Sequence, residues 1–196
     1  MKQFEVRADY DAETIVVYQA YRPAIADAAV AAQRFVNPFS LNRMTWIKPS
    51  FRWMMHRCGW ATKPGQERVV AVRITRAGWE EALSQAVLTT PEARVYDSHE
   101  QWRERFDRAA VRVQWDPEYS LRDVKLDHRS IQVGLSRDII RRYVKDWTVA
   151  IRDLTPFVHE IAACLASGDV ERAEALLPRE EPYPLDDRLA NTIGAS

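Results

Sequence analysis

The apolar residues of this chain follow two different spacings. In some short segments they alternate with polar residues, which is typical of a β-strand. In others they recur every three or four positions, as on one face of a helix. The segments that fit strands are rich in β-branched and aromatic residues. We predict strands at residues 4–7, 14–21, 44–48, 68–74, 110–115 and 129–135.

Helices are predicted between and after these strands. The first starts at Pro23, where the missing N–H costs nothing. Its apolar stripe is predicted to consist of Ile25, Ala28, Ala29 and Ala32. Ser50 and Gly59 are suited to cap a helix over residues 51–58. Further helices are predicted to begin at Thr75 (running through Val87), Ser98, Ser136 (running through Ile151), Thr155 and Asp169.

Strands and helices alternate over the first two-thirds of the chain, and the last third is predicted to be helical. We therefore expect an α+β (mixed α/β) fold, with a central split or mixed sheet of about five or six strands flanked by helices. A chain of 196 residues is long enough for one domain with its own core. We expect residues 1–178 to form this single domain. Residues 179–196, rich in proline and acidic residues, are expected to be a flexible tail.

Composition narrows the class of protein. Hydrophobic residues make up 46% and charged residues 29% of the chain, which excludes a globally disordered protein. The net charge of zero argues against non-specific coating of nucleic acid, so any anion must be bound locally. No apolar run approaches the roughly 20 residues that span a bilayer, and no signal core begins the chain. We expect a cytoplasmic protein without a membrane partner, in which Cys58 and Cys164 are free thiols.

One stretch, residues 43–60, is unusually aromatic and basic. It holds three of the seven tryptophans, and residues 43–68 carry six basic side chains against one acid, Glu67. Within the predicted helix, Phe51, Met54, Met55 and Cys58 form the core face, while Trp53 and Arg57 fall on the opposite, polar face. One interpretation is a core in which arginines stack over indoles. The other is a site for a flat, anionic ligand, formed by Arg43, Trp46, Lys48, Ser50, Trp53 and Arg57.

Other polar residues lie within or at the ends of the predicted strands. Gln19, Gln114 and Gln132 each interrupt an apolar strand and either face one common pocket or mark the solvent side of each strand. Glu118 follows the turn at Asp116-Pro117 and is our candidate for a catalytic carboxylate. The four histidines and two cysteines show no metal-ligand spacing, so no metal site is predicted. The chain has no glycine-rich phosphate loop and no Gly-x-Ser-x-Gly motif.

Several motifs together resemble one family. They are Tyr18-Gln-Ala-Tyr21, Met44-Thr-Trp-Ile-Lys-Pro-Ser-Phe51, Lys63-Pro-Gly-Gln-Glu-Arg68, Val113-Gln-Trp-Asp-Pro-Glu118 and Arg129-Ser-Ile-Gln132. The family is the one called domain of unknown function 4291, and the resemblance covers nearly the whole chain up to the tail. It implies little about activity, because the family name assigns none.

A second resemblance does imply an activity. The Tyr-Gln-Ala-Tyr strand and the helix Ile25-Ala-Asp-Ala-Ala-Val-Ala-Ala-Gln-Arg-Phe35 are similar to the opening of ADP-ribosyltransferase-type domains. These split-sheet proteins bind NAD in a cleft between strands, with a polar or aromatic residue on the first strand, a Tyr or Ser on the second and a late Glu. The resemblance implies Tyr18 or Gln19 as the first element, Ser50 or Trp46 as the second and Glu118 as the third. The sequence departs from the pattern because the first strand lacks the usual His or Arg, and Gln132 stands where a late-strand Glu is expected.

Two functions are therefore predicted. The favoured one is an ADP-ribosyltransferase-like enzyme that uses NAD as a substrate, with nucleic acid as one acceptor to consider. Its catalytic residues would be Glu118, Tyr18 and Gln19, and its NAD-binding residues Arg43, Trp46, Lys48, Ser50, Trp53, Arg57 and Gln132. The alternative is a non-catalytic module that binds nucleotides or nucleic acid through exposed tryptophans and phosphate contacts.

Overall fold

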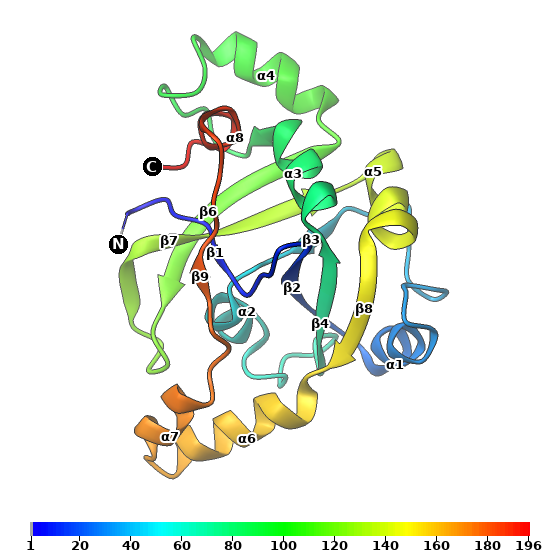
Figure 1. Cartoon of the computed structure of the whole chain (residues 1–196), viewed down its shortest axis with the longest axis vertical. Helices are drawn as coiled ribbons and strands as arrows, with labels where there is room; N and C mark the ends of the chain where they lie inside the picture. Colours follow the sequence, from blue (N-terminus) through cyan, green and yellow to red (C-terminus); the bar gives the residue numbers. More distant parts are fainter. Residues whose placement is uncertain (1) are drawn as a thin grey trace.

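Two β-sheets form the centre of the molecule in the computed structural model, which describes residues 2–196 (Figure 1). The first sheet has the strand order β3 (Thr45–Ile47), β7 (Lys125–Leu135), β6 (Val111–Tyr119) and β5 (Ala86–Leu88). The second has the order β2 (Thr14–Tyr21), β4 (Arg68–Thr75) and β8 (Thr148–Asp153). All neighbouring strands are antiparallel except β5 and β6, which are parallel. The predicted α+β fold is confirmed, with seven strands in these two sheets rather than five or six.

The two sheets meet where β3 ends. The Tyr18 N–H on β2 donates to the Lys48 carbonyl at 2.6 Å, in an isolated bridge just beyond β3. Pro49 then turns the chain into α2 (Phe51–Cys58). The Ser50 side chain accepts from the Trp53 N–H, and Gly59 ends the helix with a φ of 58°, so both predicted caps are confirmed. As a result, Lys48 and Ser50 lie at the junction between the sheets.

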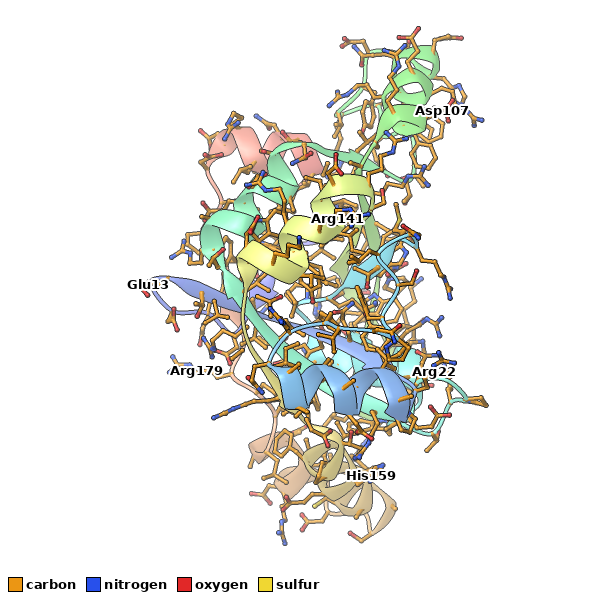
Figure 2. All side chains as sticks on the ribbon, turned by 90° about the vertical axis from the view of Figure 1, so that its right-hand side faces the viewer. Glu13, Arg22, Asp107, Arg141, His159 and Arg179 are labelled. Carbon is orange, nitrogen blue, oxygen red and sulfur yellow. The ribbon has the colours of Figure 1, made fainter. Side chains whose placement is uncertain are left out.

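Helices surround both sheets (Figure 1). Helix α1 (Pro23–Ala32) packs against β4 and β8 and faces the viewer in Figure 2; it buries Ala26 and Ala29, whereas Ala32, predicted on the buried stripe, is exposed. The other helical segments are α3 (Arg76–Ser84), α4 (His99–Arg108), α5 (Arg137–Arg142) with a π-helical turn at Tyr143–Trp147, α6 (Thr155–Ala166), α7 (Val170–Ala175) and α8 (Asp187–Ile193). No helix within residues 2–196 is long and apolar enough to cross a membrane. The cysteines Cys58 and Cys164 are free, as predicted.

Two predicted helices end earlier than expected. The helix after Thr75 stops at Ser84, and Ala86 and Val87 instead form β5, which pairs with β6. The helix after Ser136 stops at Trp147, and the next residues form β8, which pairs with β4. In both places hydrogen bonds to a distant strand override the local helical spacing. Close packing accompanies the second change, because a Cβ at Gly78 would lie 2.3 Å from the Trp147 ring.

The predicted flexible tail is ordered in the structure. Strand β9 (Glu181–Pro182) pairs with β1 (Arg7–Ala8), and α8 packs against α3 and β5. Ile193 is fully buried, and the Ser196 N–H donates to the Phe4 carbonyl at 2.9 Å, so the two termini lie side by side (Figure 1). The prediction failed because proline and acidic residues indicate disorder only when no partner segment is available, and here β1 provides one.

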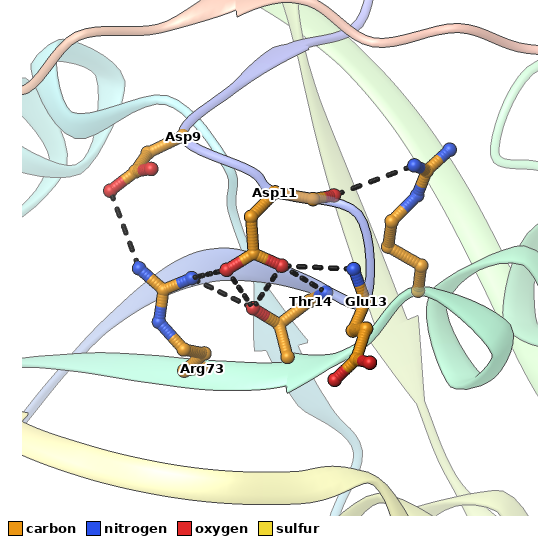
Figure 3. Close-up of polar contacts among 6 residues, drawn as sticks. Asp9, Asp11, Glu13, Thr14 and Arg73 are labelled. Atoms are coloured by element: carbon orange, nitrogen blue, oxygen red, sulfur yellow. Dashed lines mark hydrogen bonds and ion pairs between the residues drawn. The ribbon is translucent and has the colours of Figure 1, made fainter.

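A polar cluster fixes the start of β2 against β4 (Figure 3). The Asp11 carboxylate accepts hydrogen bonds from the Glu13 and Thr14 N–H groups at 2.9 and 2.7 Å, and Arg73 donates to Asp11 and Thr14 at 2.9 and 2.7 Å. These backbone hydrogen bonds, more than the nearby Arg73 charge, hold the pKa of Asp11 below its ordinary value. The polar groups of this cluster form hydrogen bonds with one another, so we interpret the cluster as a turn with a structural role.

Candidate functional site

The first sheet has one apolar face and one polar face. Successive side chains of a strand point to opposite faces, and on β6 and β7 the residues Val111, Val113, Ile131, Val133 and Leu135 are buried in the core. The register places Trp46 beside Gly134 and Gly134 beside Arg112, Gln132 beside Gln114, and Ser130 beside Asp116. We call the set of Trp46, Lys48, Arg112, Gln114, Asp116, Ser130, Gln132 and Gly134 the polar face.

Glutamines on the polar face converge on one carboxylate. The Gln114 Nε2 donates to Asp116 at 2.7 Å, and the Gln132 Nε2 donates to its other oxygen at 2.5 Å. Gln19 lies elsewhere: it is buried, donates to Thr45 and to the Trp46 carbonyl, and accepts from Tyr143. The idea that all three glutamines face one pocket is therefore wrong for Gln19, which fills a structural role.

Lys48 and Trp53 are buried next to each other at the junction of the sheets. Lys48 is 6% and Trp53 is 7% exposed, and the Lys48 Nζ lies 6.0 Å from the indole centroid. Burial, followed by the nearby Arg57 charge, lowers the pKa of Lys48 to about 8, against a partial opposing effect of Asp116. Trp53 was predicted on the exposed face of α2; it is buried because α2 lies against the end of the first sheet, near β6.

Ser50 and Glu118 form a buried hydrogen bond at the start of α2. The Ser50 hydroxyl donates to Glu118 Oε2 at 2.5 Å, and Glu118 Oε1 accepts from the Tyr119 N–H at 3.0 Å. Glu118 is 4% exposed. It reaches Ser50 at a register shift in the β6–β7 pairing, between Pro117 and Tyr119, which redirects the side chain.

A second carboxylate lies at the same helix start. Glu180 accepts from the Phe51 N–H at 2.7 Å, and burial, with the Glu118 charge as a further cause, raises the pKa of Glu180 to about 8. Both carboxylates line a narrow pocket with basic side chains around it: Arg7, Arg52, His128 and Arg129. Sequence reasoning missed Glu180 because it lies in the proline-rich segment taken for a tail. The one signal in the sequence was the predicted start of α2, because the first N–H groups of a helix have no acceptor within the helix and favour a nearby carboxylate.

The other predicted site residues are dispersed. Tyr18 is buried and packs edge-on against Phe51, so it belongs to the core rather than to a cleft. Arg43 is exposed and lines a different hollow, beside Tyr21 and Phe39. Trp46 lies over Gly134, where a Cβ would come within 3.0 Å of its ring. Of the predicted set, the structure brings Lys48, Ser50, Trp53 and Glu118 to the junction, with Trp46 and Gln132 on the adjoining polar face and Arg57 exposed on α2.

Comparison with protein-family models gives one match. The model described as Domain of unknown function (DUF4291) matches residues 5–183. The chain belongs to this family. The DUF4291 match includes Lys48, Ser50, Glu118 and Glu180 and ends before α8. No curated protein matches this DUF4291 chain, and the resemblance to ADP-ribosyltransferase-type domains has no counterpart in these comparisons. Within residues 2–196, no group of three or more His, Cys, Asp or Glu side chains is placed to hold a metal ion.

Proposed function

We propose that this DUF4291 protein binds NAD, or a closely related nucleotide, along the polar face and acts as an ADP-ribosyltransferase-type enzyme. The observation that carries the proposal is the hydrogen bond between Ser50 and Glu118. These residues are 68 positions apart. The resemblance implies Ser50 or Trp46 as the second element and Glu118 as the late acid of an NAD site, and of the first two Ser50 is bonded to Glu118. Their contact close to the junction of the two sheets supports the proposal.

The chemistry assigns a role to each group. Cleavage of the nicotinamide–ribose bond passes through an oxocarbenium-like state, which the Glu118 carboxylate stabilises electrostatically. Ser50 holds that carboxylate in place with its 2.5 Å hydrogen bond. Nicotinamide leaves with the bonding electron pair, and a nucleophilic acceptor forms the new bond to the ribose carbon and loses a proton. Lys48 supplies positive charge for the diphosphate, and Trp46 offers a half-buried ring for a base. Tyr18 and Gln19 have no catalytic role in the proposed mechanism, because both side chains are buried in the core.

Release of nicotinamide from NAD tests the proposal. Purified protein is incubated with NAD, with and without oligonucleotide or protein acceptors, and nicotinamide is quantified by chromatography. Glu118→Gln keeps an acceptor for Ser50 but removes the charge, so we expect release to fall by about 100-fold or more. Glu104→Gln, an exposed glutamate on α4, is the matched control and should retain full activity. The proposal fails if the wild-type protein neither binds NAD nor releases nicotinamide, or if Glu118→Gln releases it at the wild-type rate.

The alternative of a non-catalytic binding module stays in second place. Stacking of single-stranded bases requires exposed aromatic rings. Trp53 is only 7% exposed, which leaves the half-buried Trp46 as the tryptophan of this site with a ring open to a base. NAD binding without nicotinamide release would favour this alternative over the enzyme.

A further inference from the structure

Two buried hydrogen-bond donors at the junction of the sheets lack adequate acceptors. The indole N–H of Trp53 is buried and has no hydrogen-bond partner among residues 2–196. The Lys48 ammonium has three N–H donors but only one hydrogen bond, to the Trp46 carbonyl at 3.3 Å, and it forms no ion pair with another described residue. Buried donors without acceptors are uncommon, and each requires a specific explanation.

No neighbouring side chain supplies the missing acceptors. The charge of Asp116 acts on Lys48, but Asp116 forms no ion pair with it in the described chain, and its oxygens accept from Gln114 and Gln132. Arg57 adds a second positive charge to the same region and opposes the protonated state of Lys48. The carboxylates near the junction, Asp116, Glu118 and Glu180, are hydrogen-bonded to other groups, and none of them forms an ion pair with Lys48 within residues 2–196.

Trp79 provides an internal comparison. Its indole N–H is also buried without a partner in the described chain, and its ring is fully buried in the core. Within residues 2–196, however, no cation lies over the Trp79 ring, whereas Lys48 lies over the ring of Trp53. At Lys48 and Trp53, a buried N–H without an acceptor lies beside a buried cation without an ion pair. This combination distinguishes the pair from Trp79, which has only the N–H.

We infer that Lys48 and the Trp53 indole N–H together bind one phosphate group, and that this is the diphosphate subsite of the nucleotide proposed above. A phosphate offers several acceptor oxygens to the two donors, and its double charge compensates both Lys48 and Arg57. The inference thus rests on the proposed function for the identity of the ligand, but the donors themselves do not depend on it.

The position of the subsite agrees with this assignment. Lys48 and Ser50 are separated only by Pro49, and two residues of extended chain span about 7 Å. A phosphate on Lys48 would therefore lie at the same bend of the chain as Ser50, which holds the Glu118 carboxylate. The polar face continues along the sheet from Lys48 toward Gln132 and Trp46, the residues that the proposed function assigns to the rest of the nucleotide.

Calorimetric titration with pyrophosphate, ADP and NAD at low salt tests the inference. The variants are Lys48→Met, which keeps the length of the side chain, and Trp53→Phe, which keeps the ring but removes the N–H. We expect Lys48→Met to weaken pyrophosphate and ADP binding by roughly 10- to 100-fold, and Trp53→Phe by about 3- to 10-fold. Lys145→Met, at an exposed lysine, and Trp60→Phe, at a half-buried tryptophan, are matched controls and should bind as the wild type does. Circular dichroism verifies that every variant is folded.

The outcomes separate this inference from the proposed function. Pyrophosphate and ADP binding that is lost in both variants, without nicotinamide release from NAD, supports the phosphate subsite and contradicts the transferase. Nicotinamide release that is unchanged in folded Lys48→Met supports the transferase and overturns the subsite. Absence of pyrophosphate and ADP binding to the wild type, or binding that neither variant changes, also overturns the subsite.

Discussion

The hydrogen bonds of Ser50 allow the consequence of removing one hydroxyl to be calculated. In Ser50→Ala the Trp53 N–H loses its cap acceptor at 3.1 Å, and Glu118 loses a donor at 2.5 Å. Loss of a serine cap costs about 1 kcal/mol, and loss of a hydrogen bond to a charged acceptor about 1.5–3 kcal/mol. Because Glu118 is 4% exposed, water has little access to replace the hydroxyl. We expect the free energy of unfolding to fall by about 2.5–4 kcal/mol.

Urea unfolding followed by circular dichroism measures this loss, and two further variants assign its origin. Ser50→Thr retains a hydroxyl and should lose less than about 1 kcal/mol. A double-mutant cycle with Glu118→Gln isolates the contribution of the carboxylate charge, because glutamine keeps an acceptor for Ser50. When residue 118 is glutamine, Ser50→Ala should cost the cap and a neutral hydrogen bond, so we expect a coupling free energy of about 1 kcal/mol.

Two results would refute this reasoning. A loss of less than about 1 kcal/mol in Ser50→Ala would mean that the hydroxyl is not bonded to a buried carboxylate. An equal loss in Ser50→Thr and Ser50→Ala would mean that the shape of the side chain, rather than its hydroxyl, is what the site requires. Either result would also remove the observation on which the proposed function depends.

Three further predictions concern titration and packing. Since Glu180 has a pKa of about 8, above its ordinary value of 4.5, folding favours its protonated form and stability should fall as pH rises from about 4.5 to 8. In thermal melts, the melting temperature of Glu180→Gln should therefore rise relative to that of the wild type as the pH increases over this range. A difference in melting temperature that does not change with pH would contradict the raised pKa of Glu180. Lys48 has a pKa of about 8, below its ordinary 10.5, so its burial is destabilising below pH 8 and this effect fades as pH rises toward 10.5. Lys48→Met should accordingly melt higher than the wild type at pH 7, with a margin that shrinks above pH 8; a lower melting temperature would show that Lys48 is paired. Finally, Gly78→Ala places a Cβ 2.3 Å from Trp147 and should lower the free energy of unfolding by about 3 kcal/mol in urea titrations, whereas a change below about 1 kcal/mol would show that the contact is loose.

The elements that the sequence predicted well are those defined by local patterns. Strand β2 covers Thr14–Tyr21, as predicted, because alternation and β-branched residues act over a few positions. Helix α2 lies between Ser50 and Gly59, as predicted, because each cap has its own backbone chemistry. These signals require no knowledge of the remainder of the chain.

The elements that it missed depend on distant partners. Strand β8 follows directly from a helical turn, and only its pairing with β4 separates the two. A residue distant in sequence also bonds the outer edge of β8. The Gln33 side-chain amide donates to the Ile151 carbonyl and accepts from the Ile151 N–H. Strand β9 requires β1, which lies at the other end of the chain. Local spacing carries no information about such pairings.

The sequence pointed to some residues of the candidate site but not to their arrangement. Charge and aromatic content identified Lys48 and Trp53, and the strand end identified Glu118. Their environment was not predictable, because burial of Trp53 depends on where α2 packs against the sheet. The hydrogen bond between Ser50 and Glu118 depends on the register shift in β6, which no local pattern indicates.

The case for a ligand depends on the buried charge rather than on the polarity of the sheet. One face of an antiparallel sheet is commonly solvated, so Gln114 and Gln132 alone need no further explanation. Elsewhere, charged side chains such as Glu13 and Arg141 point into solvent (Figure 2). Lys48 instead remains buried without an ion pair in the described chain, a state that destabilises the fold and that a methionine would avoid. An anion that binds only the folded protein would reverse this penalty, since such a ligand stabilises the native state in proportion to its occupancy. The phosphate subsite proposed above would therefore give the buried Lys48 a role that folding alone does not require.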